Sequence, residues 1–545
     1  MSYRQTEFDV IVIGSGAAGL TAALTASATG ARVLILEKSD LIGGTSAMSG
    51  AGTWIPCNRL AREAGIADSR EDGLTYLRCA SPEGWGEVED THWQSFIDHA
   101  AAMIDFVEAH TPLRYELIAE PDPKAELPGG KETGRMISPK PLSRRLIGKL
   151  AGKLRRSTLP HLFTYHELIT EDLYHAPFTS FARCAPQLIW RWLSDRRGQG
   201  SALITGLLKG CLDQGCRLWL GSRVTELMLD SAGGVKGVVA RSGDENYSIG
   251  ARRGVVLATG GFEWDRDLLQ RYFPGGAERL GSPCSNEGDG QRLAEQAGAQ
   301  LDRMDQANIY PCLPTIYEGR LHGVPVTFQA EPHAIVVNGK GERFVSEYDY
   351  NLGEALDRRD AVTGQPINLP AWVIGDDRLW RSSLPFRWYA RKDPGWVKRS
   401  GTLEALAEII GIGPEALSAT VQRWNGFCAA GTDHDFHRGE TVWERYKSKA
   451  GTGEARANPT LGAIEFGPFI AMSINRSILG TKGGARTNSK GEVLRADGTV
   501  IAGLYAAGNA MANPIGTRAA GAGTTIGPCM TWGYICGKAM LASNR

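Results

Sequence analysis

The beginning of the chain alternates short apolar runs with glycine-rich turns. An apolar run at 8–13 (FDVIVI) ends at a GSGAAG turn (14–19), and the next residues, LTAALTASAT, have the apolar period of a helix. A second apolar run (31–38, ARVLILEK) contains Glu37 near its end, eighteen residues after Gly19. This order predicts strand, tight turn, helix and strand, which is the βαβ unit that binds a dinucleotide.

The residue types in this unit suit a dinucleotide. Gly14 and Gly16 let the backbone approach a pyrophosphate at the positive end of the helix, and Gly19 lets the helix pack against the strand. Glu37 is suited to accept hydrogen bonds from ribose hydroxyls. The following segment, GGTSAMSGAGTWIP (43–56), offers small and hydroxyl side chains, which favour a flavin over a nicotinamide.

The pattern changes at 80–195, where helical periodicity dominates and β-branched runs are few. A basic run there (139–157, PKPLSRRLIGKLAGKLRRS) is interpreted as a solvated helix face rather than an anion or membrane patch. An amphipathic helix is predicted at 198–215, followed by strands and a hairpin through the glycine pair at 233–234. The run GVVLATGGF (254–262) predicts a strand that returns to the nucleotide site.

The rest of the pattern indicates an inserted domain. Tyr- and Pro-rich turns, a strand (IVVNGKGERFV) and the helical segments LEALAEIIG and EALSATVQRWNGFCAAG occupy 297–462. Strands, tight turns, a glycine-rich loop and a terminal helix follow at 463–545. We therefore predict a nucleotide-binding domain in two pieces, 1–296 and 463–545, with a second domain at 297–462 between them.

Composition and charge narrow the choice of partners. The chain has 60 Lys and Arg against 60 Asp and Glu, so nucleic acid and anionic membrane are not expected as partners. The ten cysteines include no CxxC pair, which argues against zinc or iron–sulfur sites and predicts buried thiols in a reducing compartment.

No leader and no apolar run of about 18 residues occurs, so a soluble, cytoplasmic protein without an integral membrane segment is expected. Asp433, His434, Asp435 and His437 are metal ligands by type, but a polar turn is the favoured interpretation and no metal is predicted.

Four motifs resemble the flavoprotein family of fumarate reductase and 3-ketosteroid dehydrogenase: VIVIGSGAAG…EK, GGTSAMSGAGTWIP, GVVLATGGF and GTKGGARTN…GLYAAGN…GAGTTIGPCMTWGY. WIP, ELPGGKETGR (126–135), DHDFHRGE (433–440) and TTIGP are most similar to the ketosteroid dehydrogenase branch. The resemblance implies an α/β fold with a discontinuous Rossmann-like FAD-binding domain and an inserted α+β substrate domain. Membrane-bound members of the resembling family attach FAD covalently through a histidine close to the second glycine cluster. The first histidine here is His92, far from that cluster, so non-covalent FAD is expected.

The residues expected to bind FAD come from both pieces of that domain. They are Gly14, Gly16, Ala17, Ala18, Gly19, Glu37, Lys38, Gly44, Thr45, Ser46, Ser49, Gly50, Val224, Thr259, Gly260, Gly508, Asn509, Gly523, Thr525 and Ile526.

The substrate domain lacks the fumarate-handling residues of the family. Tyr310 precedes a proline where dicarboxylate-reducing relatives have a histidine, and no arginine follows soon after RFVSE. For a ketone substrate, the resemblance makes Tyr350 the predicted base for the α-proton, assisted by Tyr310 and Tyr348. Backbone N–H groups around Gly523, at the start of the last helix, would stabilise the developing enolate.

One position departs from the ketosteroid dehydrogenases, because Ala519 stands where they have a ketone-binding tyrosine. Arg518, Thr517 or a tyrosine from elsewhere must supply the missing donor, and Arg518 is also placed to anchor a substrate carboxylate. Trp54 and Trp532 are expected either beside the flavin or substrate or in the core.

The favoured function is FAD-dependent desaturation of a cyclic ketone, either cyclohexanone-like or a 3-ketosteroid. Hydride would pass to the flavin, and the electrons would go to an external quinone-like or other non-nicotinamide acceptor. Two alternatives stay open: a soluble reductase of an activated alkene, and a flavin-binding electron-transfer subunit without turnover.

Overall fold

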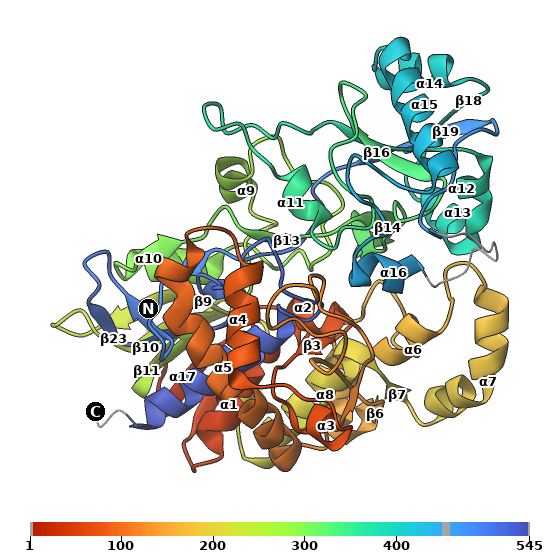
Figure 1. Ribbon diagram of the computed structural model, residues 1–545. Coiled ribbons are helices and arrows are strands. Elements are labelled where there is room, and N and C mark those ends of the chain that lie inside the picture. Colours follow the sequence, from red (N-terminus) through yellow and green to blue (C-terminus); the bar gives the residue numbers. More distant parts are fainter. Residues whose placement is uncertain (1–3, 449–457, 543–545) are drawn as a thin grey trace.

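The computed structural model describes residues 4–448 and 458–542 (Figure 1). Its largest sheet has eight strands in the order β22-β23-β11-β1-β2-β8, with β10 paired to β11 and β9 paired to β10. β1 is parallel to both β2 and β11, as a dinucleotide-binding unit requires. The strands of this sheet are β1 (Arg4–Ile13), β2 (Val33–Leu36), β8 (Arg217–Trp219), β9 (Ser222–Leu229), β10 (Val235–Ser242), β11 (Glu245–Leu257), β22 (Glu492–Leu494) and β23 (Val500–Ala506).

The helix that follows β1 contacts the last helix of the chain. In α1 (Ala17–Ser27) every residue is buried, and α17 (Ile526–Ala542) lies along it. Glycines on α17 allow the close approach, because a Cβ on Gly533 would lie 2.3 Å from the carbonyl oxygen of Ala18. Helices from near the beginning and the end of the described chain therefore share one core.

Helix α8 (Gln199–Asp213) differs from its prediction. An amphipathic helix was expected, but twelve of its fifteen residues are buried. The positions that look polar in the sequence carry small buried side chains such as Ser201 and Thr205, and the Ser201 hydroxyl lies 3.1 Å from His161 Nδ1. The neighbouring helices α1 and α2 (Gly44–Met48) contact α8. The small hydroxyl residues made the sequence resemble an amphipathic helix, although α8 is a core helix.

The segment expected to be a helical excursion is mixed. It contains long helices, irregular chain, and the strands β4 and β5, which form a small antiparallel sheet with the earlier strand β3 in the order β3-β5-β4. Its basic run is not a regular helix: η1 (Arg144–Lys153) is a 3₁₀ helix interrupted at Gly148, whose φ is +55°. Apart from η1, the elements between residues 53 and 197, a range that includes this segment, are β3 (Thr53–Trp54), α3 (Arg59–Glu63), α4 (Arg70–Ala80), α5 (Trp85–His110), β4 (Tyr115–Leu117), β5 (Met136–Pro139), β6 (Leu142–Ser143), α6 (Tyr165–Thr170), α7 (Pro177–Leu193) and β7 (Arg196–Arg197).

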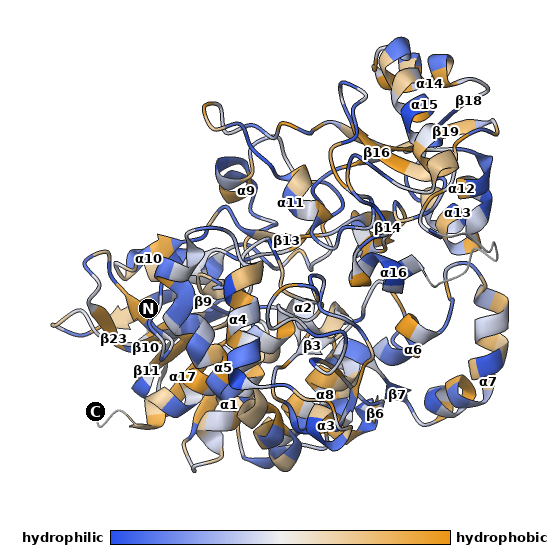
Figure 2. Cartoon of the chain, in the orientation of Figure 1, coloured by the Kyte–Doolittle hydropathy of each residue, from blue (hydrophilic) through white to orange (hydrophobic). Residues whose placement is uncertain are grey.

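The inserted part of the chain has its own sheet, in the order β16-β17-β19-β18, and Figure 2 shows the hydrophobic colour of β16. Hydrophobic clusters lie on both sides of it. Because β19 belongs to this sheet, the inserted part extends beyond residue 462, where we expected it to end. Its main elements are β16 (Ala334–Asn338), α11 (Leu352–Leu356), β17 (Ala371–Gly375), α12 (Asp377–Ser382), α13 (Leu384–Ala390), β18 (Val397–Ser400), α14 (Leu403–Ile410), α15 (Pro414–Ala430), α16 (Val442–Ser448) and β19 (Phe469–Ile474).

Further short elements complete the described chain. They are α9 (Arg266–Tyr272), α10 (Asp289–Gln296), β12 (Leu301–Asp302), β13 (Ala307–Ile309), β14 (Cys312–Tyr317), β15 (Arg320–Pro325), β20 (Ile478–Thr481), β21 (Gly484–Ala485) and η2 (Gly508–Ala510). Strand β12 pairs with β21 and β13 with β20, so the chain leaves and re-enters the larger part side by side. Within the described ranges, no helix is both long and apolar enough to cross a bilayer.

Candidate active site

The turn between β1 and α1 is built for close backbone contact. Gly14 has a φ of +111°, and a Cβ there would lie 2.2 Å from the carbonyl oxygen of Ala258, just after β11. A Cβ on Gly19 would lie 2.1 Å from the carbonyl oxygen of Gly14, so α1 packs directly on the turn. Gly16 is the N-cap of α1. This arrangement presents the positive end of a buried helix, where an anion is stabilised.

Glu37 follows β2 and faces the same turn. Its Oε2 accepts hydrogen bonds from the backbone N–H of Ser15 (3.1 Å) and the hydroxyl of Ser15 (2.7 Å). Its Oε1 accepts a hydrogen bond from the backbone N–H of Ser39 (2.9 Å). These contacts hold the carboxylate in one orientation at the end of the strand, where it can receive ribose hydroxyls.

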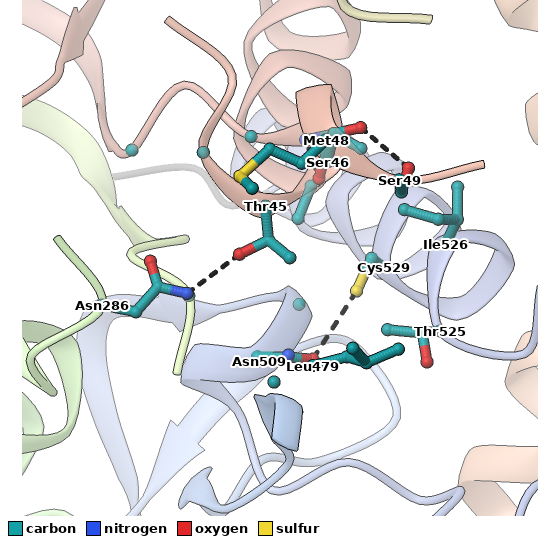
Figure 3. A pocket seen from close by; sticks show the side chains of 18 of the residues that line it. Thr45, Ser46, Met48, Ser49, Asn286, Leu479, Asn509, Thr525, Ile526 and Cys529 are labelled. Atoms are coloured by element: carbon teal, nitrogen blue, oxygen red, sulfur yellow. Dashed lines mark hydrogen bonds between the residues drawn. The ribbon is translucent and has the colours of Figure 1, made fainter. Parts of the chain in front are cut away.

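Hydroxyl and amide side chains join separate segments around this turn (Figure 3). The Ser46 hydroxyl accepts a hydrogen bond from the first N–H of α1 (3.1 Å). The Asn286 amide donates to the Thr45 hydroxyl (2.9 Å), and the Cys529 thiol donates weakly to Asn509 Oδ1 (3.9 Å). The contact between Asn286 and Thr45 joins residues that are 241 positions apart, so distant segments hold one another in place.

One cavity of about 310 Å³ connects these groups. Every residue expected to bind the cofactor lines it except Gly19, which packs behind the turn. Sequence reasoning missed other lining residues, including Asn286, Leu479 and Tyr165. These three lie outside the glycine motifs, so the motifs contain no signal for them.

Two tyrosines from different parts of the chain line the same cavity. Tyr350 lies just before α11 in the inserted part, and Tyr165 is the first residue of α6. Burial is the main cause that raises the pKa of each phenol well above its usual value of 10. Both phenols therefore keep their protons at neutral pH.

A buried carboxylate accompanies these phenols. Glu120 is 3% exposed, and its Oε2 accepts a hydrogen bond from the Tyr165 hydroxyl (2.8 Å). Its Oε1 lies 3.4 Å from Lys447 Nζ. The charge of Glu120 also contributes to the raised pKa of Tyr350 and of Tyr310. The negative charge of Glu120 therefore raises the pKa of three phenols, those of Tyr165, Tyr310 and Tyr350.

One signal in the sequence lies close to Glu120. This residue belongs to the segment AEPDPKAELPGG (119–130), which ends in the ELPGG motif named above. The structure brings its carboxylate to the phenols. Tyr165 had no such signal, because only tertiary contacts bring α6 to the cavity.

Tyr310 lies in a second, smaller cavity of about 20 Å³ that shares Tyr350 with the large one. The ring of Tyr350 packs edge-on against Trp443, with 4.8 Å between ring centroids. Tyr348 is buried against Arg438, whose guanidinium carbon lies 4.7 Å from the ring centre. Tyr310 and Tyr348 thus border the small cavity and do not line the large one.

The loop before α17 is tied to the inserted part beside Tyr350. Asn351 Oδ1 accepts a hydrogen bond from the backbone N–H of Ala519 (2.9 Å), and Asn351 Nδ2 donates to the carbonyl of Ala519 (3.2 Å). Gly523, in the same loop, has a φ of +82°, and a Cβ there would lie 2.5 Å from the carbonyl oxygen of Gly52. The predicted oxyanion-binding loop is therefore fixed next to the predicted base.

Arg518 does not line the cavity. Its guanidinium makes two hydrogen bonds, of 2.8 and 2.6 Å, to the Glu354 carboxylate. The expectation that Arg518 polarises a ketone or anchors a substrate carboxylate does not match this geometry, because its charge is already paired. The Thr517 hydroxyl accepts a hydrogen bond from the backbone N–H of Ala307 (3.1 Å) and also lies outside the cavity lining.

Other candidates have structural roles. Trp54 and Trp532 lie in the hydrophobic core, and the Trp54 indole donates to Asp122 Oδ1 (2.7 Å). Asp433 is buried and accepts hydrogen bonds from Arg343 (3.1 and 3.0 Å). Among the residues that the structure describes, no cluster of His, Cys, Asp and Glu is arranged to hold a metal ion.

Comparisons with known proteins agree with this geometry. A family model described as an FAD binding domain matches residues 9–526. The 4-oxocyclohexanecarboxylate 2-dehydrogenase of Sinomonas cyclohexanicum is 36% identical, over 98% of this chain and 93% of that protein. A 3-oxosteroid 1-dehydrogenase of Mycobacterium tuberculosis is 35% identical, over 97% of each chain.

Solved structures give the same result for the fold. The 3-ketosteroid Δ1-dehydrogenase of Sterolibacterium denitrificans has a TM-score of 0.88 at 32% identity, covering 99% of this chain and 100% of that chain. A flavocytochrome c3 fumarate reductase has a TM-score of 0.64 at 22% identity, covering 98% of this chain and 78% of that chain, a likeness of fold alone.

Proposed function

We infer the function of this chain from the premise that it belongs to the FAD binding domain family. The predicted α/β flavoprotein fold is confirmed, and the protein binds FAD. From the two dehydrogenase relatives and the cavity, we propose that it is an FAD-dependent oxidoreductase that introduces a carbon–carbon double bond next to a ring ketone.

The residues around the cavity fit FAD. Gly14 and Gly16 leave room for a pyrophosphate at the N-terminus of α1, and Glu37 is oriented for a ribose. The hydroxyls of α2 and the loop around Gly523 would hold the flavin end. When bound, FAD supplies a two-electron acceptor for the hydrogen on the carbon next to the α-carbon.

The phenol cluster offers a route for the α-proton. In our proposal, Tyr350 takes the α-proton, its own proton passes to the Tyr165 hydroxyl, and the Tyr165 proton passes to Glu120. The electron pair of the broken C–H bond stays on the substrate as an enolate, and Glu120 becomes neutral. The hydrogen bond from Tyr165 to Glu120 supports this route. The raised pKa of Tyr350 gives the reason for a relay, because an isolated phenolate is scarce at neutral pH.

The enolate oxygen needs donors that the protein holds in place. The backbone N–H groups of the loop around Gly523 lie at the start of α17, where the helix dipole favours negative charge. Asn351 fixes Ala519 in the same loop. Main-chain donors of this loop would therefore take the place of the phenol that Ala519 lacks.

Lys447 favours a substrate with a carboxylate. Its ammonium borders the small cavity next to Tyr350 and lies 4.7 Å from the Trp443 ring centre, and its contact with Glu120 is long, at 3.4 Å. An ammonium has three N–H donors, and its one hydrogen bond to Glu120 uses only one of them, so the others can bind an anionic group. We therefore favour a compact oxo-acid such as 4-oxocyclohexanecarboxylate, on which one relative acts, over a neutral ketosteroid.

We further propose non-covalent FAD and a quinone-like or other non-nicotinamide electron acceptor. In the described part of the chain no histidine lines the cavity, and the side chain of His92 contacts the carbonyl of Thr487 instead. A single dinucleotide fingerprint in the sequence argues against a second nucleotide carrier. Release of the flavin by acid precipitation of the protein would demonstrate non-covalent attachment.

Anaerobic flavin reduction tests the proposed reaction. The purified holoprotein is mixed separately with 4-oxocyclohexanecarboxylate, cyclohexanone and a 3-ketosteroid, and the visible flavin band is followed. We expect the oxo-acid to bleach the flavin faster than the other two ketones, and we expect mass spectrometry to detect the corresponding enone. If no ketone bleaches the flavin, but an unsaturated acid or an enone reoxidises the dithionite-reduced protein, the enzyme is a reductase. Absence of both reactions would leave an electron-transfer subunit.

A further inference from the structure

Helix α7 carries large apolar side chains on the outside of the molecule. It lies at the outer edge of the ribbon in Figure 1, with Phe178 at 76% and Trp192 at 65% exposure. Its exposed large apolar residues, which we call the α7 face, are Phe178, Phe181, Ile189, Trp190, Trp192 and Leu193. Isolated exposed apolar residues are ordinary, but six on one helix mark an interaction surface.

The buried side of α7 is comparatively polar. Ser180, Cys184, Leu188 and Arg191 are the residues that point into the protein. The Arg191 guanidinium makes hydrogen bonds of 2.6 and 2.8 Å to the Glu167 carboxylate, so its charge is satisfied inside. A helix packed on a water-soluble domain has its apolar stripe inward and its charges outward. In α7 the buried side includes Cys184 and Leu188 but also the charged Arg191, and the outer side has six large apolar residues beside the exposed Arg183. This outer side is suited to an apolar environment outside the protein.

Positive charge accumulates beside this face. Residues 139–197 contain eleven Lys and Arg but four Asp and Glu, although the whole chain has no net charge. The four acids are already paired, in the contacts Arg191–Glu167, Arg183–Glu171, His175–Asp172 and Arg144–Asp195. The surplus charge of this segment is therefore positive.

Contacts join that charge to the apolar side chains. The Arg145 guanidinium donates to the carbonyl of Leu193 (2.8 Å), at the last residue of α7. The guanidinium carbon of Arg196 lies 4.8 Å from the ring centre of Trp190. Lys149 and Lys153 are exposed on η1, next to Arg145 in sequence. Tryptophan, aliphatic side chains and cations thus lie together at one edge.

The balanced charge of the whole chain argued against an anionic membrane as partner, but the local surplus of cations reverses that expectation for this segment. We propose that the α7 face and η1 dock on an anionic lipid bilayer, with α7 lying in the plane of the interface. Phe, Ile and Leu would enter the boundary of the acyl chains, while Trp and the cations remain at the level of the headgroups. A second copy of the chain fits less well, because a twofold contact through this face would bring the same surplus cations together. An anionic bilayer offers both the apolar layer and the opposite charge.

The docking face is separate from the reaction site. None of its six apolar residues lines either cavity. Docking can therefore be measured with the intact holoprotein without relying on any substrate, and variants of this face should keep FAD and any activity.

Vesicle sedimentation tests the docking. The holoprotein is centrifuged with phosphatidylcholine vesicles, with vesicles that also contain phosphatidylglycerol, and without lipid, each at low and high salt. We expect pelleting with the phosphatidylglycerol vesicles that weakens at high salt. Phe178→Ser combined with Trp192→Ser should lower the partition coefficient about ten-fold or more, which corresponds to ~1.4 kcal/mol. Val362→Ser removes an apolar side chain that is 93% exposed elsewhere and should leave binding unchanged.

The flavin absorbance and melting temperature of each variant report whether it is folded. Binding that ignores phosphatidylglycerol and salt, or that the double variant retains in full, would overturn the proposal. So would a dimer, detected by light scattering, that the double variant dissociates, because the face would then join two copies. Equal loss of binding in Val362→Ser would show that the effect is not specific to α7.

Discussion

At the scale of single residues, the hydrogen bond between Tyr165 and Glu120 is the contact on which the proton route depends. Glu120→Gln keeps the shape of the side chain but removes the carboxylate that would receive the proton. We expect kcat for ketone desaturation to fall about 100-fold or more, with FAD content unchanged. Because the charge of Glu120 helps to raise the pKa of Tyr350, Tyr350 should ionise at lower pH in the variant than in the wild type, so the residual kcat should rise with pH.

Tyr165→Phe is the matched control, since it removes the same hydrogen bond and leaves the charge. If both residues act in one relay, the double variant should be no slower than the slower single variant. Wild-type kcat in Glu120→Gln at every pH would contradict the relay, while loss of turnover in Tyr350→Phe alone would keep Tyr350 as the base.

A second residue-scale prediction separates two cations. Lys447→Met should raise KM for 4-oxocyclohexanecarboxylate about ten-fold, because the cation beside the phenol cluster is lost, and should leave KM for cyclohexanone unchanged. Arg518→Met provides the comparison, since that charge is paired with Glu354 outside the cavity. Steady-state kinetics on both ketones decide the point. If Arg518→Met raises KM for the anionic ketone but not for cyclohexanone, Arg518 and not Lys447 binds the substrate carboxylate.

At the scale of elements, His175 connects the chain before α7 to the inserted part. Its Nε2 lies 2.9 Å from Glu331 and its Nδ1 2.9 Å from Asp172. Burial lowers the pKa of His175, but the two carboxylates outweigh burial and raise the pKa to about 9. A folded-state pKa above the usual ~6.5 stabilises the fold fully below about pH 6.5, and this contribution is lost as pH rises through 9.

We therefore expect the melting temperature to fall between pH 6.5 and 9.5, with a contribution from His175 of at most about 3 kcal/mol. His175→Gln should lower the melting temperature near pH 6 and flatten this pH dependence, as measured by scanning calorimetry. If the melting temperature of the variant falls with pH as steeply as that of the wild type, His175 is not the source of the pH dependence. His437→Gln is the control, because this histidine is exposed and its loss should leave the pH dependence of the melting temperature unchanged.

At the scale of the whole molecule, the FAD cavity joins residues from Ile13 to Cys529. A ligand that binds only the folded chain stabilises it by ~2.7 kcal/mol at 100 times its Kd. Removing FAD should therefore lower the melting temperature by a few degrees, and adding FAD back should restore it. Adding FMN, which lacks the adenosine that Glu37 would hold, should restore less. Equal melting temperatures with and without FAD would contradict a cavity that FAD fills.

Local elements were predicted well where a local pattern determines them. The βαβ unit, the hairpin at the glycine pair 233–234 and the paired helices α14 and α15 appear where the sequence placed them. Predictions failed where the outcome depends on neighbours far away in the chain. Helix α8 was predicted to be amphipathic but is a core helix, because most of its residues are buried. The basic run was predicted to be a regular helix but forms the 3₁₀ helix η1, which is interrupted at Gly148, where φ is positive.

The sequence by itself determined the cofactor and most of the glycine, hydroxyl and acidic residues that line the large cavity, because glycine turns, helix ends and a strand-end acid act through local backbone geometry. Only the tertiary structure decided which side chains share the reaction cavity. It brought Tyr165 and Glu120 to Tyr350, paired Arg518 with Glu354, and turned the apolar side of α7 outward. Those outcomes depend on packing between distant segments, and no local spacing encodes such contacts.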